Sequence, residues 1–93
     1  METDLKELGR QLAEIDHGII VAVKKRMELA RKVAECKIQK GGEPILRMDI
    51  EEARLFQFAK WAAEEGVNPH FAQSLLYQLI SESCRVQIGE VQK

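Results

Sequence analysis

The sequence of 93 residues has few of the features that mark membrane, secreted or metal-binding proteins. Its apolar runs fall short of the roughly 20 residues that span a bilayer, and its N-terminal residues lack the layout of a signal peptide. The two cysteines, Cys36 and Cys84, lie far apart without metal-ligand spacing, so we expect reduced thiols in a cytoplasmic protein without a bound metal. The formal net charge of -1 lacks the basic excess typical of nucleic-acid-binding proteins. We therefore expect neither a membrane nor a nucleic acid as a partner.

Proline is scarce too, with two residues in the chain, and the first segment has none. We predict one helix over residues 4–40 that ends at Gly41 and Gly42. Its apolar residues recur every three or four positions, which is the pattern of a single helix face. The residues of this apolar stripe are Leu5, Leu8, Leu12, Ile15, Ile19, Ala22, Leu29, Val33 and Cys36. Arg26 occupies a position within the stripe, and we expect an anion or a wet cavity to meet it, because burying an unpaired guanidinium is costly.

Turn residues and capping signals predict two shorter helices in the second half of the chain. After a loop, Asp49 and Glu52 have the spacing of a capping box that opens a second helix, which runs to Gly66. Asn68 and the proline after it supply an N-cap and a first-turn proline for a third helix. We expect this third helix to end near Ile88.

The helix lengths predict how the chain assembles. A helix of about 36 residues is about 54 Å long, whereas helices of about 17 and 20 residues reach only about 25 and 30 Å. Half of the apolar stripe would then have no partner within the chain. We predict a single all-α domain over residues 1–93 that forms a homodimer, in which the two long helices lie side by side and the shorter helices close each end.

Two cations of the long helix and two polar residues of the third helix are candidate ligand-binding groups. Lys37 follows Arg26 by eleven residues, close to three helical turns, so both side chains project along one side of the helix and suit a ligand with two carboxylates. The other cations around them fit a solvated helix face. Ser83 and Gln87 continue the inward face of the third helix, where a buried polar group needs a partner. They meet each other, a water or a ligand, or else they form a polar helix end that frays into solvent.

Three segments together carry a resemblance to a known enzyme family. They are the run IDHGIIVAVKKRMELARKVAECK, the helix with Glu52, and the run LLYQLISESCRVQ. From about Leu5 to Gln87, the chain resembles the small all-helical class of chorismate mutases. The resemblance implies three helices per chain that interlock as a homodimer with two active sites. It also implies rearrangement of chorismate to prephenate in aromatic amino-acid biosynthesis, without a cofactor.

The resemblance further implies roles for individual residues. Arg26 and Lys37 fall on the family's two substrate cations within the chain, and Glu52 falls on the glutamate that holds the substrate hydroxyl. If the third helix is shifted by one residue, Gln87 falls on the donor to the breaking ether bond, with the substrate-binding Ser83 one turn earlier. Such groups act by restricting the conformation of the ligand and by stabilising charge in the transition state.

The family's remaining cations have no direct match in this chain. The arginine that the family takes from the partner's long helix falls on Gly9. Its neighbour Arg10 would bind substrate only with a different local backbone or dimer register, because adjacent helical residues point about 100° apart. The family's aspartate and arginine near the start of the second helix are also missing, and Arg47 or Arg54 would replace that arginine.

Alternatives for the site and for the function stay open at this point. Without the shift in the third helix, Ile88 and Cys84 take the two inward positions, and neither side chain hydrogen-bonds as an amide or hydroxyl does. An isochorismate-pyruvate lyase has the same fold and a similar dianionic substrate. A dimeric ligand-sensing module without catalysis is the third reading, because two of the family's arginines are absent.

Overall fold

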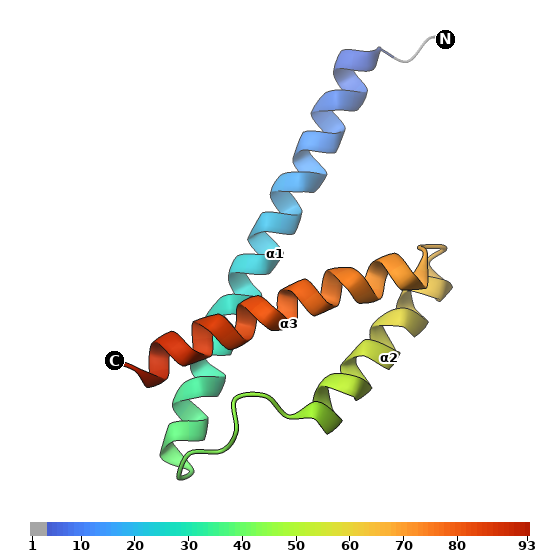
Figure 1. Cartoon of the computed structure of the whole chain (residues 1–93). Helices are drawn as coiled ribbons and strands as arrows, with labels where there is room; N and C mark the ends of the chain where they lie inside the picture. The colour runs from blue at the N-terminus through green and yellow to red at the C-terminus, as the bar shows by residue number, and fades with distance from the viewer. Residues whose placement is uncertain (1–3) are drawn as a thin grey trace.

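The computed structural model describes residues 4–93, which form three helices (Figure 1). Helix α1 spans Leu5–Gln39, α2 spans Met48–Glu64 and α3 spans Pro69–Val91. No strand occurs in this part of the chain, so the all-α prediction is confirmed. None of these helices is both long and apolar enough to cross a membrane.

Capping groups begin and end the helices much as the sequence predicts. The Asp4 carboxylate accepts a hydrogen bond from a first-turn backbone N–H of α1 at 3.0 Å. Beyond the end of α1, Gly41 and Gly42 have φ angles of 91° and 85°, which glycine adopts without steric cost. At the start of α3 the Asn68 side chain accepts from two first-turn N–H groups at 2.9 and 3.2 Å, and Pro69 follows it.

Two predicted helix ends are wrong. Helix α2 begins with Arg47 at the N-cap, so the capping box of Asp49 and Glu52 does not form. Acidic side chains in the first turn interact favourably with the helix dipole, and this helix begins without a side-chain cap. Helix α3 continues past Ile88 and through Gly89, because a single helical glycine costs only about 1 kcal/mol relative to alanine.

Helix α3 holds the fold together, because it packs on both α1 and α2. In the described part of the chain no Cα atom of α1 lies within 8 Å of a Cα atom of α2. The buried residues of α1 are Met27, Ala30 and Ala34, and Val86 of α3 completes the small core with the first two. These residues lie on a different face of α1 from the apolar stripe. The stripe is exposed along its whole length, although we expected half of it to pack within the chain.

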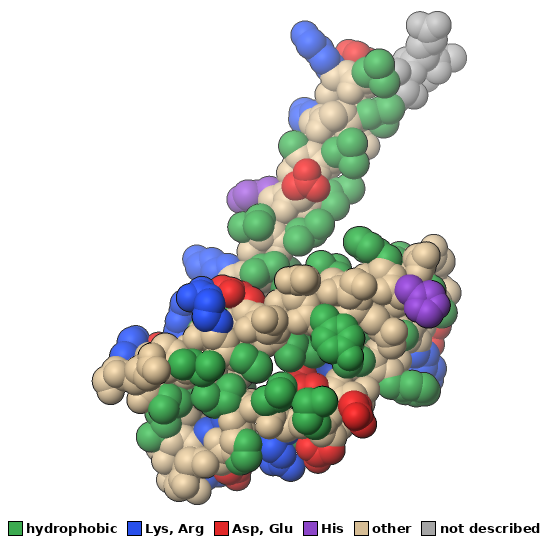
Figure 2. Space-filling model, viewed as in Figure 1, with side chains coloured by type: hydrophobic (Ala, Val, Ile, Leu, Met, Phe, Trp, Pro, Cys, Tyr) green, Lys and Arg blue, Asp and Glu red, His purple; other side chains and the backbone are tan. Residues whose placement is uncertain are grey.

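The molecule is extended rather than compact, because the N-terminal half of α1 projects away from α2 and α3 (Figure 1). The radius of gyration is 17.0 Å, against about 12 Å for a compact chain of this length. The accessible surface is 7476 Å², against about 5,500 Å² for a folded monomer of this mass. Figure 2 shows hydrophobic side chains along the projecting helix. A single chain therefore leaves much apolar surface in water.

Two glycines of this fold are expected to respond in opposite ways to alanine. Gly66 follows α2 with a φ of 72°, so Gly66→Ala is expected to lower the free energy of unfolding by about 1–2 kcal/mol. Gly89 lies inside α3, and a Cβ added there meets nothing within 4 Å. Gly89→Ala is therefore expected to raise that free energy by up to about 1 kcal/mol. Urea denaturation at one fixed protein concentration measures both variants, and a shift of the same sign in both would contradict this account.

Candidate active site

All three helices and the loop between α1 and α2 border one cavity of about 370 Å³. Its walls come from the C-terminal half of α1, the loop, the first turns of α2 and the C-terminal half of α3. In Figure 1 these segments lie around the crossing of α1 and α3 and the start of α2. The volume suits a small organic ligand. Among residues 4–93, no group of three or more His, Cys, Asp or Glu side chains is arranged to hold a metal ion.

Two cations of α1 line this cavity and donate hydrogen bonds to α3. Arg26 Nη1 donates to Ser83 Oγ at 2.7 Å, and Lys37 Nζ donates to Gln87 Oε1 at 3.0 Å. Lys37 Nζ also donates to the backbone carbonyl of Ile45 at 2.6 Å, which ties the loop to the α1 wall. The structure thus brings together four of the residues singled out from the sequence, in pairs that lie 57 and 50 positions apart.

The register of α3 is the one that places Ser83 and Gln87 inward. Their exposed fractions are 8% and 7%, whereas Ile88 is 44% exposed. Cys84 is half-buried and borders the cavity beside Ser83. The end of the helix therefore does not fray into solvent at these positions, and its two buried polar groups have partners, as buried polar groups generally do.

The positive charge of Arg26 is only partly compensated. Burial lowers the pKa of its guanidinium, the nearby charge of Arg54 lowers it further, and the Glu51 carboxylate opposes both effects. The ordinary pKa of arginine lies so far above neutrality that the group stays protonated. Ser83 is a neutral acceptor, so its hydrogen bond positions the guanidinium without cancelling the charge. The cavity wall at Arg26 therefore favours an anion.

Glu52, singled out from the sequence, does not border the cavity, but its neighbour does. Glu52 is exposed, whereas Glu51 is half-buried and lies on the cavity wall. Adjacent helical residues point about 100° apart, so the two carboxylates cannot share one face. Oε2 of Glu51 is buried and has no hydrogen-bond partner in the part of the chain that the structure describes. A buried acceptor without a partner is rare in folded proteins, which marks Glu51 as a candidate ligand-binding residue.

Arg47 and Arg54 both border the cavity on the α2 side, four residues before and three residues after Glu51. Arg54 and Glu51 are three residues apart and share one face of α2, whereas Arg47 precedes the helix as its N-cap. Arg47 Nη2 lies 3.5 Å from Asp49 Oδ2, and Arg54 Nε lies 4.0 Å from Glu51 Oε1. Both arginines suggested by the sequence are therefore at the cavity.

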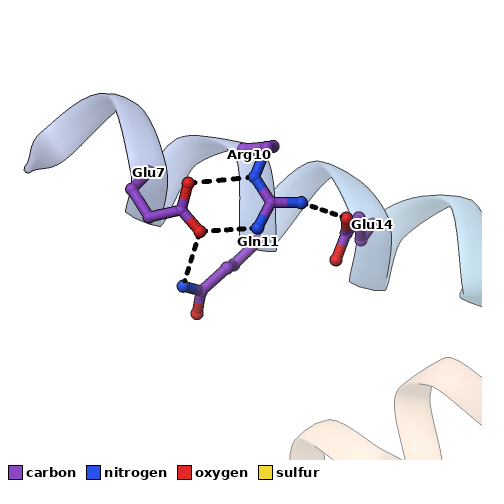
Figure 3. Close-up of polar contacts among 4 residues, drawn as sticks. All are labelled: Glu7, Arg10, Gln11 and Glu14. Atoms are coloured by element: carbon purple, nitrogen blue, oxygen red, sulfur yellow. Dashed lines mark hydrogen bonds and ion pairs between the residues drawn. The ribbon is translucent and has the colours of Figure 1, made fainter.

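Arg10 lies on the projecting part of α1 and does not border the cavity of its own chain; Figure 3 shows its polar contacts. Its guanidinium donates to Glu7 at 3.0 and 2.5 Å and to Glu14 on the other side. Gln11 also donates to Glu7, at 3.2 Å. Exposed ion pairs of this kind contribute little free energy, so another anion can replace either carboxylate. Within one chain, Arg10 takes no part in the site.

The fold and the cavity define an all-helical protein with a cation-lined pocket of a size that suits a small ligand. The chain belongs to the chorismate mutase type II family, whose sequence profile matches residues 8–88. It is similar to the 4-amino-4-deoxychorismate mutase of Streptomyces venezuelae, with 26% identity over 86 residues that cover 92% of this chain and 82% of that protein. No solved structure matches the chain significantly. Membership of this family supports an enzyme of the isomerase type.

Stability measurements separate a ligand-binding role of Arg26 from a structural one. Arg26→Met removes a half-buried charge and keeps an unbranched side chain, so the free energy of unfolding is expected to hold or rise. Ser83→Ala takes away the acceptor of the Arg26 guanidinium and is expected to lower that free energy by about 1 kcal/mol. Urea denaturation measures both variants. If Arg26→Met proved the less stable of the two, the arginine would be a structural residue.

Proposed function

We propose that this protein catalyses the rearrangement of chorismate to prephenate, a step of aromatic amino-acid biosynthesis in the cytoplasm. The observation that carries the proposal is the cavity in which Arg26 and Lys37 stand against Ser83 and Gln87. Membership of the chorismate mutase type II family supports the same class of reaction. The reaction is an isomerisation, so no group enters or leaves the substrate.

The reaction requires the protein only to position the substrate and to stabilise its charge. In this intramolecular Claisen rearrangement, an ether C–O bond breaks while a C–C bond forms in the same molecule. A flexible dianion must be held in a compact conformation, and hydrogen-bond donors must stabilise the negative charge that develops on the ether oxygen. Conformational restriction and preorganised donors supply both effects, and one donor of this kind is worth about 10²–10³ in rate.

The hydrogen bonds of the site suggest a role for each side chain. Arg26 pairs with one carboxylate, and Lys37 donates the one N–H that its bonds to Ile45 and Gln87 leave free to the substrate, close to the ether oxygen. Because the Gln87 carbonyl already accepts from Lys37, its amide N–H₂ is left to donate to the ether oxygen. Glu51, and not Glu52, accepts the hydrogen bond of the ring hydroxyl through its unpartnered Oε2.

We further propose that two chains form the active enzyme. The extended shape and the exposed apolar stripe of α1 support a dimer in which the two long helices cover each other. In such a dimer, Arg10 of one chain would reach the cavity of the other chain. On arrival of a substrate carboxylate, Arg10 would exchange its exposed ion pairs with Glu7 and Glu14 for the ligand.

A second candidate substrate is 4-amino-4-deoxychorismate. The similar protein from Streptomyces venezuelae is named for a mutase that acts on this compound. The free carboxylate oxygen of Glu51 would accept a hydrogen bond from a ring ammonium at least as well as from a ring hydroxyl, because a charge-assisted bond is the stronger one.

An assay of three substrates tests the proposed reaction. Chorismate, 4-amino-4-deoxychorismate and isochorismate are each incubated with the protein, and the products are identified by mass spectrometry. We expect conversion of chorismate to prephenate, and Arg26→Met, which is expected to stay folded, is the inactive control. Release of pyruvate from isochorismate would support a lyase instead, and binding without turnover of any substrate would support a ligand-sensing module.

The oligomeric state is tested by sedimentation. We expect a species of about twice the chain mass at micromolar concentration, because a monomer leaves the apolar stripe in water. A stable, folded monomer under the same conditions would rule out the proposed assembly.

The side chain of Gln87 is expected to increase kcat by about two orders of magnitude. Gln87→Ala removes the amide donor and should lower kcat by about 10²-fold or more. Gln78 is an exposed glutamine of the same helix, away from the cavity, so Gln78→Ala is the matched control and should leave kcat unchanged.

A glutamate at the same position tests the donor role directly. Gln87→Glu can donate only when its carboxyl is protonated, so its activity should rise as the pH falls. Undiminished activity of this variant at neutral pH would remove Gln87 from the mechanism.

A further inference from the structure

Arg54 is a charged residue of the cavity that has no role in the mechanism described so far. Its side chain comes from α2 and borders the cavity together with Glu51. Its Nε lies 4.0 Å from Glu51 Oε1, which is longer than a hydrogen bond. No hydrogen bond joins its guanidinium to another group in the part of the chain that the structure describes, so all five N–H donors are available.

The cavity has two walls, and their cations face it from different elements. Arg26 and Lys37 belong to α1, whereas Arg54 belongs to α2, and no Cα atom of one helix lies within 8 Å of a Cα atom of the other. A ligand between the walls therefore meets cations on both sides. A molecule with carboxylates at two ends fits this distribution of charge better than one with a single anionic group.

Electrostatics couple the two walls. The charge of Arg54 contributes, after burial, to the lowered pKa of Arg26, so the two guanidinium groups repel each other across the cavity. Repulsion between like charges costs free energy in the empty site, and an anion between them relieves it. The arrangement is thus more favourable with an anionic ligand than without one.

Arg47 is the competing residue on the same side, and its surroundings differ. Its Nη2 lies 3.5 Å from the Asp49 carboxylate, which already provides a counter-charge in the first turn of α2. Of the neighbouring charges, that of Arg54 has the largest effect on the pKa of Arg26, followed by that of Glu51. Of the two arginines, Arg54 therefore has the stronger electrostatic interaction with Arg26.

We propose that Arg54 is a specificity-determining residue that binds the second carboxylate of the substrate, opposite the carboxylate held by Arg26. The inference rests on the proposed function, since it assigns a further contact to the same dianionic substrate. Binding of a carboxylate to Arg54 leaves Glu51 free to accept a hydrogen bond from the ring substituent. Arg54 therefore selects dicarboxylates over monocarboxylates, while Glu51 distinguishes ring substituents by accepting their hydrogen bond.

The test compares Arg54→Met and Arg54→Gln with Arg54→Lys. The KM for chorismate and the calorimetric Kd for prephenate, which is also a dicarboxylate, are measured for each variant. Both neutral variants are expected to raise KM and Kd by about tenfold or more with a smaller change in kcat, because a charge-assisted bond is lost. Arg54→Lys keeps the charge and is expected to recover most of the affinity. The matched control is Arg85→Met, since Arg85 is exposed, pairs with Glu82 and lies away from the cavity.

The alternative outcomes separate this inference from the proposed function. Unchanged KM and Kd in both neutral variants would overturn it. A fall in kcat alone, with KM and Kd unchanged, would overturn it as well, because Arg54 would then position Glu51 and not bind the substrate carboxylate. If the wild-type protein does not convert chorismate, the proposed function fails, and calorimetry alone tests the role of Arg54. Loss of prephenate affinity in the neutral variants would then support a carboxylate-binding role for Arg54. Unchanged affinity in these variants, or no affinity in the wild type, would exclude that role.

Discussion

The two cations of α1 are hydrogen-bonded to neutral groups, and the properties of the cavity depend on this. Arg26 donates to a hydroxyl, and Lys37 donates to an amide and a backbone carbonyl. These bonds fix the positions of both side chains and leave their charges uncompensated at short range. With a carboxylate in place of Ser83 or Gln87, the same geometry would be an internal ion pair with no need of a ligand. The site is therefore preorganised for an anion that comes from outside the chain.

One turn of α3 serves both the packing and the chemistry. Val86 belongs to the small core with Met27 and Ala30, while the next residue, Gln87, is buried against the cavity. Val86 packs on Met27 and Ala30, and Gln87 accepts the hydrogen bond of Lys37, so both neighbours are buried against α1. The position of the amide is consequently set by the same contacts that hold α3 on α1, so a loss of packing there would also displace the donor.

The sequence predicts the parts of the site that depend on long patterns. Arg26 and Ser83 were identifiable because many turns of regular spacing define the face on which each one lies. Glu51 was not, because the direction of a residue near a helix start depends on where the helix begins, and α2 begins without a side-chain cap. The packing face of α1 also escaped the sequence analysis. Its alanines, such as Ala34, give a weaker hydrophobic signal than the large residues of the exposed stripe.

The walls that α1 and α2 contribute to the cavity are joined in two ways, through the loop between these helices and through α3, on which both of them pack. Residues 40–47 connect the two walls, and the bond from Lys37 to the Ile45 carbonyl fastens the loop to one of them. An insertion or deletion in this connection moves one wall without touching the contacts between α1 and α3. Because α2 also packs on α3, a change in the length of this short loop would alter the cavity and the packing of α2 together, so ligand size and fold stability are coupled in this chain.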